Sequence, residues 1–419
     1  MTAAPSPAAG GTKDTVRWNA RQWAVLFLLS GNMILDALEV SVVLVALPAI
    51  GAHFGLSVFN VQWMMSGFAL GFAVLLVGGG RITVRFGRRR AYLAAMLLFT
   101  LASVAGGLAN SVVLLVATRL VKGACAALTA PTGLAIIGST FPQGPQQRRA
   151  VSVYSLFGAA GFTLGLLLSG LILRTGQEEA WRWTFLFPAP VALVLLMCGL
   201  RLLPRDTDRL PARTRSTGLV LLRNGPLLRA ALGAAVFNGS YHSLLVTVTF
   251  AARDELGLSP WQTALALLPA CVPLAVTVPF AGRFVIRYGT ARPIALGAFA
   301  AFAGCALYLW RPDGAGYATS TLPALLLVGT GLACAFAALN MQATSTVDPR
   351  DRHLAVPLYQ TAVQLGAMVL LPLTALLLTR HDDGPALSLV LAASGTGLLV
   401  SLTALRGRAA APLPGKVQP

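Results

Sequence analysis

The stretch "GRITVRFGRRR", residues 80–90, recurs as "GRFVIRYGTAR", residues 282–292. Each copy is a short basic segment between long apolar runs, and the second begins 202 residues after the first. "GLS" at 55–57 recurs at 257–259 with the same offset. Because the offset is close to half of the 419 residues, the sequence predicts two homologous halves. Five positions agree between the long copies: Gly80, Arg81, Arg85, Gly87 and Arg90 match Gly282, Arg283, Arg287, Gly289 and Arg292.

The composition indicates that lipid surrounds most of the chain. Hydrophobic residues make up 56% and charged residues 11%, with a mean hydropathy of +0.72, whereas a soluble domain carries about 25% charged residues. Long apolar runs without period-two alternation favour helices over a barrel. We therefore predict an all-α integral membrane protein with twelve transmembrane helices. The expected spans are 22–50, 58–79, 91–110, 112–138, 150–173, 183–203, 227–252, 260–281, 291–310, 317–345, 354–379 and 384–405.

The basic residues predict the orientation. Lys and Arg concentrate in alternate loops, and such loops face the cytoplasm. This places both termini inside and explains the net charge of +18 without a nucleic-acid partner. The loops expected outside contain few basic residues, namely Arg174, Arg182, Arg253, Arg311 and Arg380.

The repeat predicts two pseudo-symmetric six-helix bundles in one membrane protein. Parallel halves of this kind bind substrate between them, near the midplane of the bilayer. The five cysteines lie singly inside apolar runs, so we expect no metal or cofactor. We also expect a monomer in the lipid bilayer. The expected organisation is a disordered cytoplasmic N-terminus at 1–21, bundles at 22–203 and 227–405, a cytoplasmic linker at 204–226 and a cytoplasmic tail at 406–419.

The repeated loop resembles a signature of the major facilitator superfamily, G-x-L-A-D-R-x-G-R-[RK]-x, which lies between spans two and three. The resemblance implies a cytoplasmic gate that works during alternating access. Val84 and Ile286 stand at the Asp position of the signature, so the charge pairing attributed to that Asp cannot form. The expected gate residues are Gly80, Arg81, Arg85, Gly87, Arg88, Arg89, Gly282, Arg283, Arg287 and Gly289.

The stretch "LVATRLVKGACAA", residues 115–127, resembles the family's fourth-span motif L-x-x-x-R-x-x-Q-G. Arg119 and Gly123 match the motif, and Lys122 replaces its Gln. In proton-coupled drug exporters this arginine is linked to proton transfer. An arginine in the middle of a span costs about 2.5–3.5 kcal/mol on insertion scales, so a functional role is favoured over a purely structural one.

The stretch "SLFGAAGFTLGLLLSG", residues 155–170, places small residues along one helix face, which favours close helix packing. It resembles the fifth-span motif of the antiporter branch, with Leu166 in place of Pro. "WRWTFLFPAP" at 181–190 and "ELGLSPWQTALALLP" at 255–269 resemble the drug:proton antiporter branch, which usually has fourteen spans. The expected packing residues are Gly158, Gly161, Gly165, Ser169 and Gly170.

Two carboxylates interrupt "SGNMILDALEVSVVLVALP", residues 30–48. Asp36 and Glu39 are three residues apart and share a helix face. Alignment of "VALP" with the branch's first-span motif D-x-T-I-V-N-V-A-L-P puts Glu39 at the acidic position and Ser41 at the Thr position. Helical rise places Glu39 within roughly 5 Å in depth of Arg119 and Lys122.

These four charges form either a static salt-bridge cluster or a titrating switch. The hypothesis favoured by the sequence makes Glu39 the main proton carrier, assisted by Asp36 and tuned by Arg119 and Lys122. The second half has no acidic residue in mid-span, but polar residues there could form a substrate cavity, and His242 could serve either packing or coupling. The expected cavity residues are Ser41, Asn238, Tyr241, His242, Asn340, Gln342, Tyr359, Gln360 and Gln364.

The resemblance implies a proton-coupled exporter of small amphipathic compounds, either drugs and antibiotics or an endogenous natural product, in a bacterial cytoplasmic membrane. Small molecule, protons and lipid are the expected partners. A metabolite uptake symporter or uniporter remains the alternative. An intramembrane enzyme is a distant one, because His53, His353 and His381 lack ligand spacing. A sensor is equally distant, because no signalling domain is recognisable.

Overall fold

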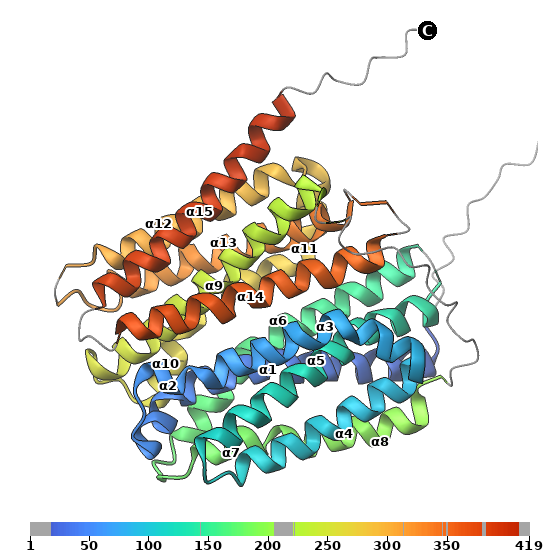
Figure 1. Cartoon of the computed structure of the whole chain (residues 1–419), viewed down its shortest axis with the longest axis horizontal. Coiled ribbons are helices and arrows are strands. Elements are labelled where there is room, and N and C mark those ends of the chain that lie inside the picture. The colour runs from blue at the N-terminus through green and yellow to red at the C-terminus, as the bar shows by residue number, and fades with distance from the viewer. Residues whose placement is uncertain are drawn as a thin grey trace, which may run out of the picture.

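The computed structural model describes residues 18–142, 144–204, 221, 223–312, 314–345, 347–348, 351–378 and 383–409. Every regular element in these ranges is a helix, and α1–α8 form one group beside α9–α15 (Figure 1). The first group is α1 Ala20–Phe54, α2 Val58–Val61, α3 Trp63–Phe86, α4 Arg88–Gly107, α5 Val112–Thr140, α6 Pro145–Leu173, α7 Trp181–Leu186 and α8 Pro188–Leu202. The second is α9 Gly225–Asp254, α10 Pro260–Leu267, the 3-10 helix η2 Leu268–Ala270, α11 Val272–Tyr288, α12 Ala291–Leu309, α13 Thr321–Ser345, α14 Arg352–Leu378 and α15 Gly384–Ala409.

Ten helical stretches in the described part of the chain are long and apolar enough to cross a membrane. The two other expected spans correspond to α9 and to the α10–α11 region. α9 is a continuous helix of 30 residues, but polar side chains between Asn238 and Ser243 interrupt its run of apolar residues. The expected single helix at 260–281 is broken at η2, because Pro269 and Pro273 cannot donate main-chain hydrogen bonds. Twelve spans therefore remain a prediction.

The sixth span, the start of the first helix and the end of the last helix also differ from the expectation. Pro188 separates α7 from α8 within the expected span 183–203. α1 starts at Ala20, where Asn19 and Gln22 form a capping box. α15 continues to Ala409, four residues into the expected tail. Residues 1–17 of the expected disordered segment, 205–220 and 222 of the linker, and 410–419 of the tail lie outside the described residues.

The repeat is visible in the backbone. Gly55 and Gly257 both have φ 61°, and Gly87 and Gly289 have φ 88° and 74°. These left-handed values favour glycine, which has no Cβ to clash. The two glycines of each pair are 202 residues apart, and α1 packs on α6 as α9 packs on α14. The sequence repeat therefore corresponds to a repeat of conformation.

Glycines also allow α3 and α5 to cross at very short distance. A Cβ on Gly71 would lie 1.9 Å from the carbonyl oxygen of Leu120, and a Cβ on Gly123 would lie 2.0 Å from that of Phe68. Small residues at such crossings let two backbones touch within a membrane. This contact gives Gly123 of the fourth-span motif a packing role and fixes the height of α5 against α3.

Three apolar cores reveal how the halves meet. One core lies at the end of the molecule near Gly55, which we call the Gly55 end, and combines residues of both halves, including Leu44, Trp181, Leu245 and Leu371. The other two belong to one half each and lie toward the opposite end, the Gly87 end. The halves are thus packed together at the Gly55 end.

The crossing of α6 and α10 belongs to this closure. A Cβ on Gly170 would lie 2.6 Å from Cβ of Ala264 and 3.2 Å from Cα of Trp261. The absence of a side chain at Gly170 therefore lets the two halves meet at main-chain distance.

Candidate functional site

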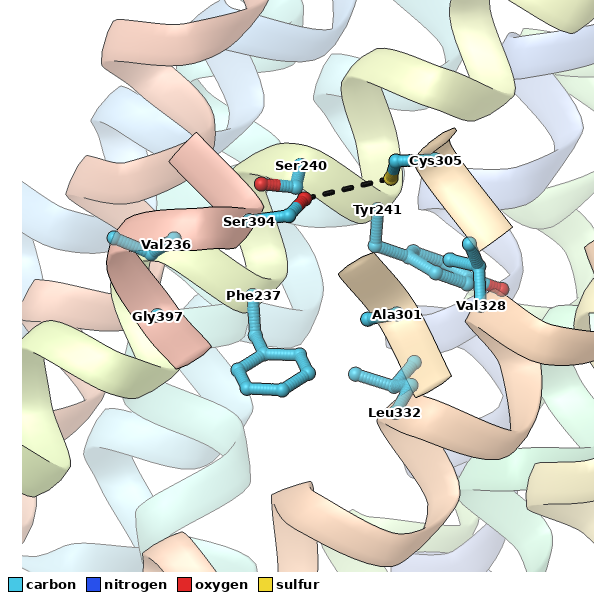
Figure 2. Close-up of a pocket in the computed structure, with 10 residues that line it drawn as sticks. All are labelled: Val236, Phe237, Ser240, Tyr241, Ala301, Cys305, Val328, Leu332, Ser394 and Gly397. Carbon is cyan, nitrogen blue, oxygen red and sulfur yellow. Dashed lines mark hydrogen bonds between the residues drawn. The ribbon is translucent and has the colours of Figure 1, made fainter. Parts of the chain in front are cut away.

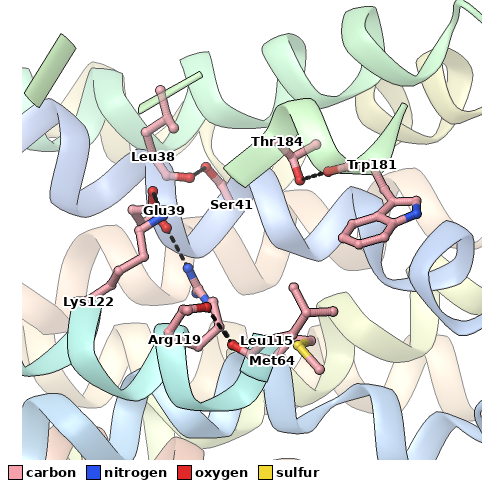
Figure 3. Close-up of polar contacts among 10 residues, drawn as sticks. Leu38, Glu39, Ser41, Met64, Leu115, Arg119, Lys122, Trp181 and Thr184 are labelled. Carbon is pink, nitrogen blue, oxygen red and sulfur yellow. Dashed lines mark hydrogen bonds and ion pairs between the residues drawn. The ribbon is translucent and has the colours of Figure 1, made fainter. Parts of the chain in front are cut away.

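A buried carboxylate with two cations lies at the centre of the first half (Figure 3). Arg119 Nη1 lies 2.5 Å from Glu39 Oε2, and Lys122 Nζ lies 2.6 Å from Oε1. All three side chains have no exposed surface. One carboxylate therefore serves as the counter-ion of two buried cations, joining α1 to α5.

Surrounding helices hold each cation in place. Arg119 Nε donates to the carbonyl oxygen of Met64 at 2.7 Å, and its guanidinium lies 4.8 Å from the ring centroid of Phe68. Lys122 Nζ lies 5.0 Å from the ring centroid of Phe99 and 5.6 Å from that of Phe185. Aromatic faces attract cations, most strongly where water is absent. α3, α4 and α7 thereby fix the two bases beside Glu39.

Asp36 has different neighbours. Asn32 Nδ2 donates to its Oδ2 at 3.1 Å, and Thr129 Oγ1 donates to the same atom at 3.2 Å. Among the described residues Asp36 forms no ion pair. The structure therefore brings three of the four expected charges into contact and sets Asp36 apart. The sequence analysis missed both partners, although Asn32 lies one turn before Asp36 on the same helix face.

Three expected cavity residues meet near the boundary between the halves. Asn238 Nδ2 donates to the carbonyl oxygen of Val363 at 2.9 Å and lies 3.5 Å from Gln364 Oε1. His242 Nδ1 lies 2.8 Å from the carbonyl oxygen of Asn238. The His242 ring centroid lies 6.4 Å from that of Phe162, which belongs to α6 of the other half. The His242 side chain of the second half therefore lies beside an aromatic side chain of the first.

The remaining cavity candidates are dispersed. Ser41 is fully buried and donates to the carbonyl oxygen of Leu38 at 3.2 Å. Tyr241 donates to the carbonyl oxygen of Ala270 at 3.3 Å, and Tyr359 lies in the core of the second half. Ser41 and Tyr359 lie in packed interiors, whereas Tyr241 lines a small pocket of the second half. The partly buried candidates are Asn340, Gln342 and Gln360.

The described arginines of the expected gate make local contacts. Arg89 Nη2 donates to the carbonyl oxygen of Leu200 at 2.5 Å, within the first half. The guanidinium carbons of Arg85 and Arg287 lie over the rings of their chain neighbours, 5.7 Å and 5.5 Å from the centroids. Gly80 and Arg81 are exposed, and Arg88 is partly buried. The side chains at Gly282, Arg283 and Ile286 lie outside the described part.

The expected packing stripe on α6 faces α1. A Cβ on Gly158 or Gly161 would come within 3 Å of α1 atoms, and one on Gly165 would lie 2.0 Å from Ser41 Oγ. Ser169 on the same helix is fully buried. Close approach of α6 thus supports the part of α1 that bears the acids.

The second half contains a small pocket (Figure 2). Ser394 Oγ donates toward Cys305 Sγ at 3.4 Å across it. No charged side chain lines it. The lining residues are Val236, Phe237, Ser240, Tyr241, Ala301, Cys305, Val328, Leu332, Ser394 and Gly397.

Comparison with known proteins adds sequence and fold relatives. Residues 29–371 match the family model described as Major Facilitator Superfamily. The chain is 30% identical to a puromycin resistance protein of Streptomyces alboniger, over 87% of this chain and 85% of that protein. It is also 30% identical to a lincomycin resistance protein of Streptomyces lincolnensis, over 84% of each. A solved D-xylose-proton symporter superposes with a TM-score of 0.75 at 17% identity, covering 91% of this chain and 96% of that one. At that identity the likeness establishes the fold alone.

Proposed function

The chain belongs to the Major Facilitator Superfamily, and we propose that it exports small amphipathic compounds in exchange for protons, by alternating access. It is a membrane transporter rather than an enzyme. The substrates we propose are drugs or antibiotics, or a natural product of the source organism. The two antibiotic resistance proteins at 30% identity support export as the direction of transport.

The observation that carries proton coupling is the buried contact of Glu39 with Arg119 and Lys122. Ionisable groups inside a membrane are costly, and they mark ion pathways and proton relays. A carboxylate that binds a proton at one stage and is ionised at another would change the charge of this site by one unit. That change provides the physical link between a proton gradient and rearrangement of the halves.

The packing of the halves supports a cytoplasmic route for substrate entry. They share one core at the Gly55 end and have separate cores toward the Gly87 end. The basic loops favour the Gly87 end as the cytoplasmic one. We propose that substrate enters from there and binds near Asn238, His242 and Gln364, where the His242 ring lies beside Phe162.

The membrane topology completes the proposal. We propose twelve spans with both termini in the cytoplasm, bundles at 22–203 and 227–405 joined by the linker 204–226, and a monomer in the bacterial cytoplasmic membrane. The arginines of the repeated loops would form the cytoplasmic gate when that end closes. Lacking an Asp at Val84, this gate would rely on main-chain and lipid-phosphate contacts of the arginines.

A drug-hypersensitive bacterial host tests the proposed function. Wild type and Glu39→Gln are expressed at matched levels, and growth inhibition is compared for puromycin, lincomycin, cationic dyes and aromatic antibiotics. We expect protection by the wild type against at least one compound and its loss in the variant. Ser103→Ala, which alters another buried polar residue of the first half, is the matched control and should retain protection.

Inside-out vesicles then test the coupling. An imposed pH gradient should drive uptake of the protective compound into vesicles containing wild type, and a protonophore should abolish it. Protection that persists unchanged in Glu39→Gln would contradict the role of the buried cluster. Accumulation of a metabolite by intact cells, with no protection, would instead establish the alternative of an uptake symporter or uniporter.

A further inference from the structure

We propose that Asp36, rather than Glu39, binds the exchanged proton, and that Glu39 is a permanent counter-ion of Arg119 and Lys122. The inference rests on the proposed proton coupling and assigns different tasks to the two acids. Sequence alone favoured Glu39 as the carrier, and the contacts in the structure favour the opposite assignment.

Glu39 is held as a carboxylate by its surroundings. Arg119 and Lys122 lie 2.5 Å and 2.6 Å from its two oxygens. Both cations have hydrogen-bond donors and no acceptor, so they offer no acceptor for the hydroxyl of a protonated Glu39. Protonation would also leave two buried cations without a counter-ion, which is unfavourable in a medium of low dielectric constant.

Asp36 lies in surroundings that suit both of its protonation states. Its hydrogen-bond partners are the amide of Asn32 and the hydroxyl of Thr129, and both are neutral. An amide and a hydroxyl can donate to a carboxylate, and each also has an oxygen that can accept from a carboxylic acid. A small rotation of Thr129 or Asn32 could therefore follow proton binding without breaking the local structure.

The charged and titratable groups around Asp36 also favour proton binding by this residue. On its own helix Glu39 acts on it as a like charge, so proton binding at Asp36 removes a repulsion. The titratable groups that face it from α4, α5 and α6 are Tyr92, Cys125 and Tyr154. None of these groups is a cation that would hold Asp36 in its ionised form.

The position of Asp36 also makes it the first acid reached from the Gly87 end. α1 runs from that end, so three residues place Asp36 about 4.5 Å nearer to it than Glu39. Asp36 is 9% exposed, whereas Glu39 is 0% exposed. Because the halves have separate cores toward this end, the route to Asp36 does not cross the shared core.

Infrared difference spectroscopy on the purified full-length protein tests the assignment without any substrate. The carbonyl band of a protonated carboxylic acid is recorded while the pH is varied, for wild type, Asp36→Asn and the matched control Asp254→Asn. Asp254 is an exposed carboxylate at the end of α9. Above about pH 6 the exposed Asp and Glu side chains are ionised and give no such band. In that range we expect a titrating band in wild type and in the control, and its loss in Asp36→Asn.

A second variant tests the assignment even if Asp36→Asn folds poorly. Thr129→Val removes a hydrogen-bond donor to the carboxylate with little change of shape. Loss of a hydrogen bond to a charged group should raise the proton affinity of the titrating acid about tenfold. The midpoint of the band should therefore move to higher pH.

The outcomes separate this inference from the proposed function. A band that persists in Asp36→Asn, an unchanged midpoint in Thr129→Val, or a wild type without any titrating band would overturn the assignment. Failure of the proposed function is read independently, as the absence of gradient-driven uptake by wild-type vesicles, whatever the infrared band does.

Discussion

Removal of the Glu39 charge should destabilise the protein through the cations that it leaves behind. Glu39→Gln preserves the size and shape of the side chain but leaves Arg119 and Lys122 buried without a counter-ion. Breaking a buried ion pair by removing one partner costs about 3–5 kcal/mol. We expect the free energy of unfolding to fall by that amount.

A second substitution should restore part of the loss. Adding Lys122→Gln to Glu39→Gln removes one of the two unpaired cations, so the double variant should be more stable than Glu39→Gln alone. Interaction energies between residues in direct contact reach about 0.5–3 kcal/mol, and full burial of this pair favours the upper part of that range. If the second substitution restores stability, the two side chains interact electrostatically. Independent contributions to packing would instead make the two losses add.

Equilibrium unfolding in mixed micelles, followed by helical circular dichroism, measures all four members of this cycle. Lys122→Arg is the charge-preserving control and should stay closer to wild type than Lys122→Gln. If the double variant lost stability equal to the sum of the two single losses, the side chains of Glu39 and Lys122 would not be coupled. The electrostatic account of the site would then be refuted.

Three further predictions concern packing and the outer surface. Gly71→Ala should reduce the free energy of unfolding by about 1–3 kcal/mol because its Cβ would overlap a main-chain oxygen of α5, whereas Gly78→Ala, with no atom within 4 Å of the new Cβ, should not. Gly170→Leu should keep the Gly55 end from closing, so protection in the drug-hypersensitive host should disappear at normal expression; retained protection would mean that this crossing is not part of closure. Arg311→Ala removes ion pairs to two partly exposed carboxylates and should cost only about 1 kcal/mol, with the difference from wild type shrinking at high salt.

Hydropathy predicted the helical spans because lipid imposes a simple rule on the backbone: all its polar groups must be satisfied internally. The rule says little about interruptions within a span. Pro188 divides the sixth span into α7 and α8. Pro269 lies within η2, and Pro273 lies in the first turn of α11. Those prolines were visible in the sequence. Proline alone would not have predicted which spans break, because Pro48 and Pro131 lie inside the continuous helices α1 and α5.

The sequence predicted those contacts of the site that depend on the depth of each residue along its transmembrane helix. A fixed rise per residue places Glu39 level with Arg119 and Lys122, and the structure has all three in contact. The contact of Asp36 with Thr129 depends instead on the rotation of α1 relative to α5, which is set by tertiary packing. Thr129 lies two helical turns beyond Lys122 on α5, so the face was predictable while the contact with Asp36 was not.

The first half has buried charged side chains where the equivalent part of the second half has a neutral pocket. This difference bears on the role of the buried charges. Residues of α1, α3, α5 and α7 surround the charged cluster of the first half (Figure 3), and Phe99 of α4 lies beside Lys122. Residues of α9, α12, α13 and α15 surround the neutral pocket of the second half (Figure 2). Phe99, which lies beside Lys122, and Ala301, which lines the pocket, differ by the 202-residue offset of the repeat. The second half thus forms the same helical arrangement there without an ion pair. Because the arrangement does not depend on buried charge, structural support does not account for the cost of burying Glu39 with two cations. A fixed charged cluster beside Asp36, serving the proton coupling that we propose, accounts for that cost better.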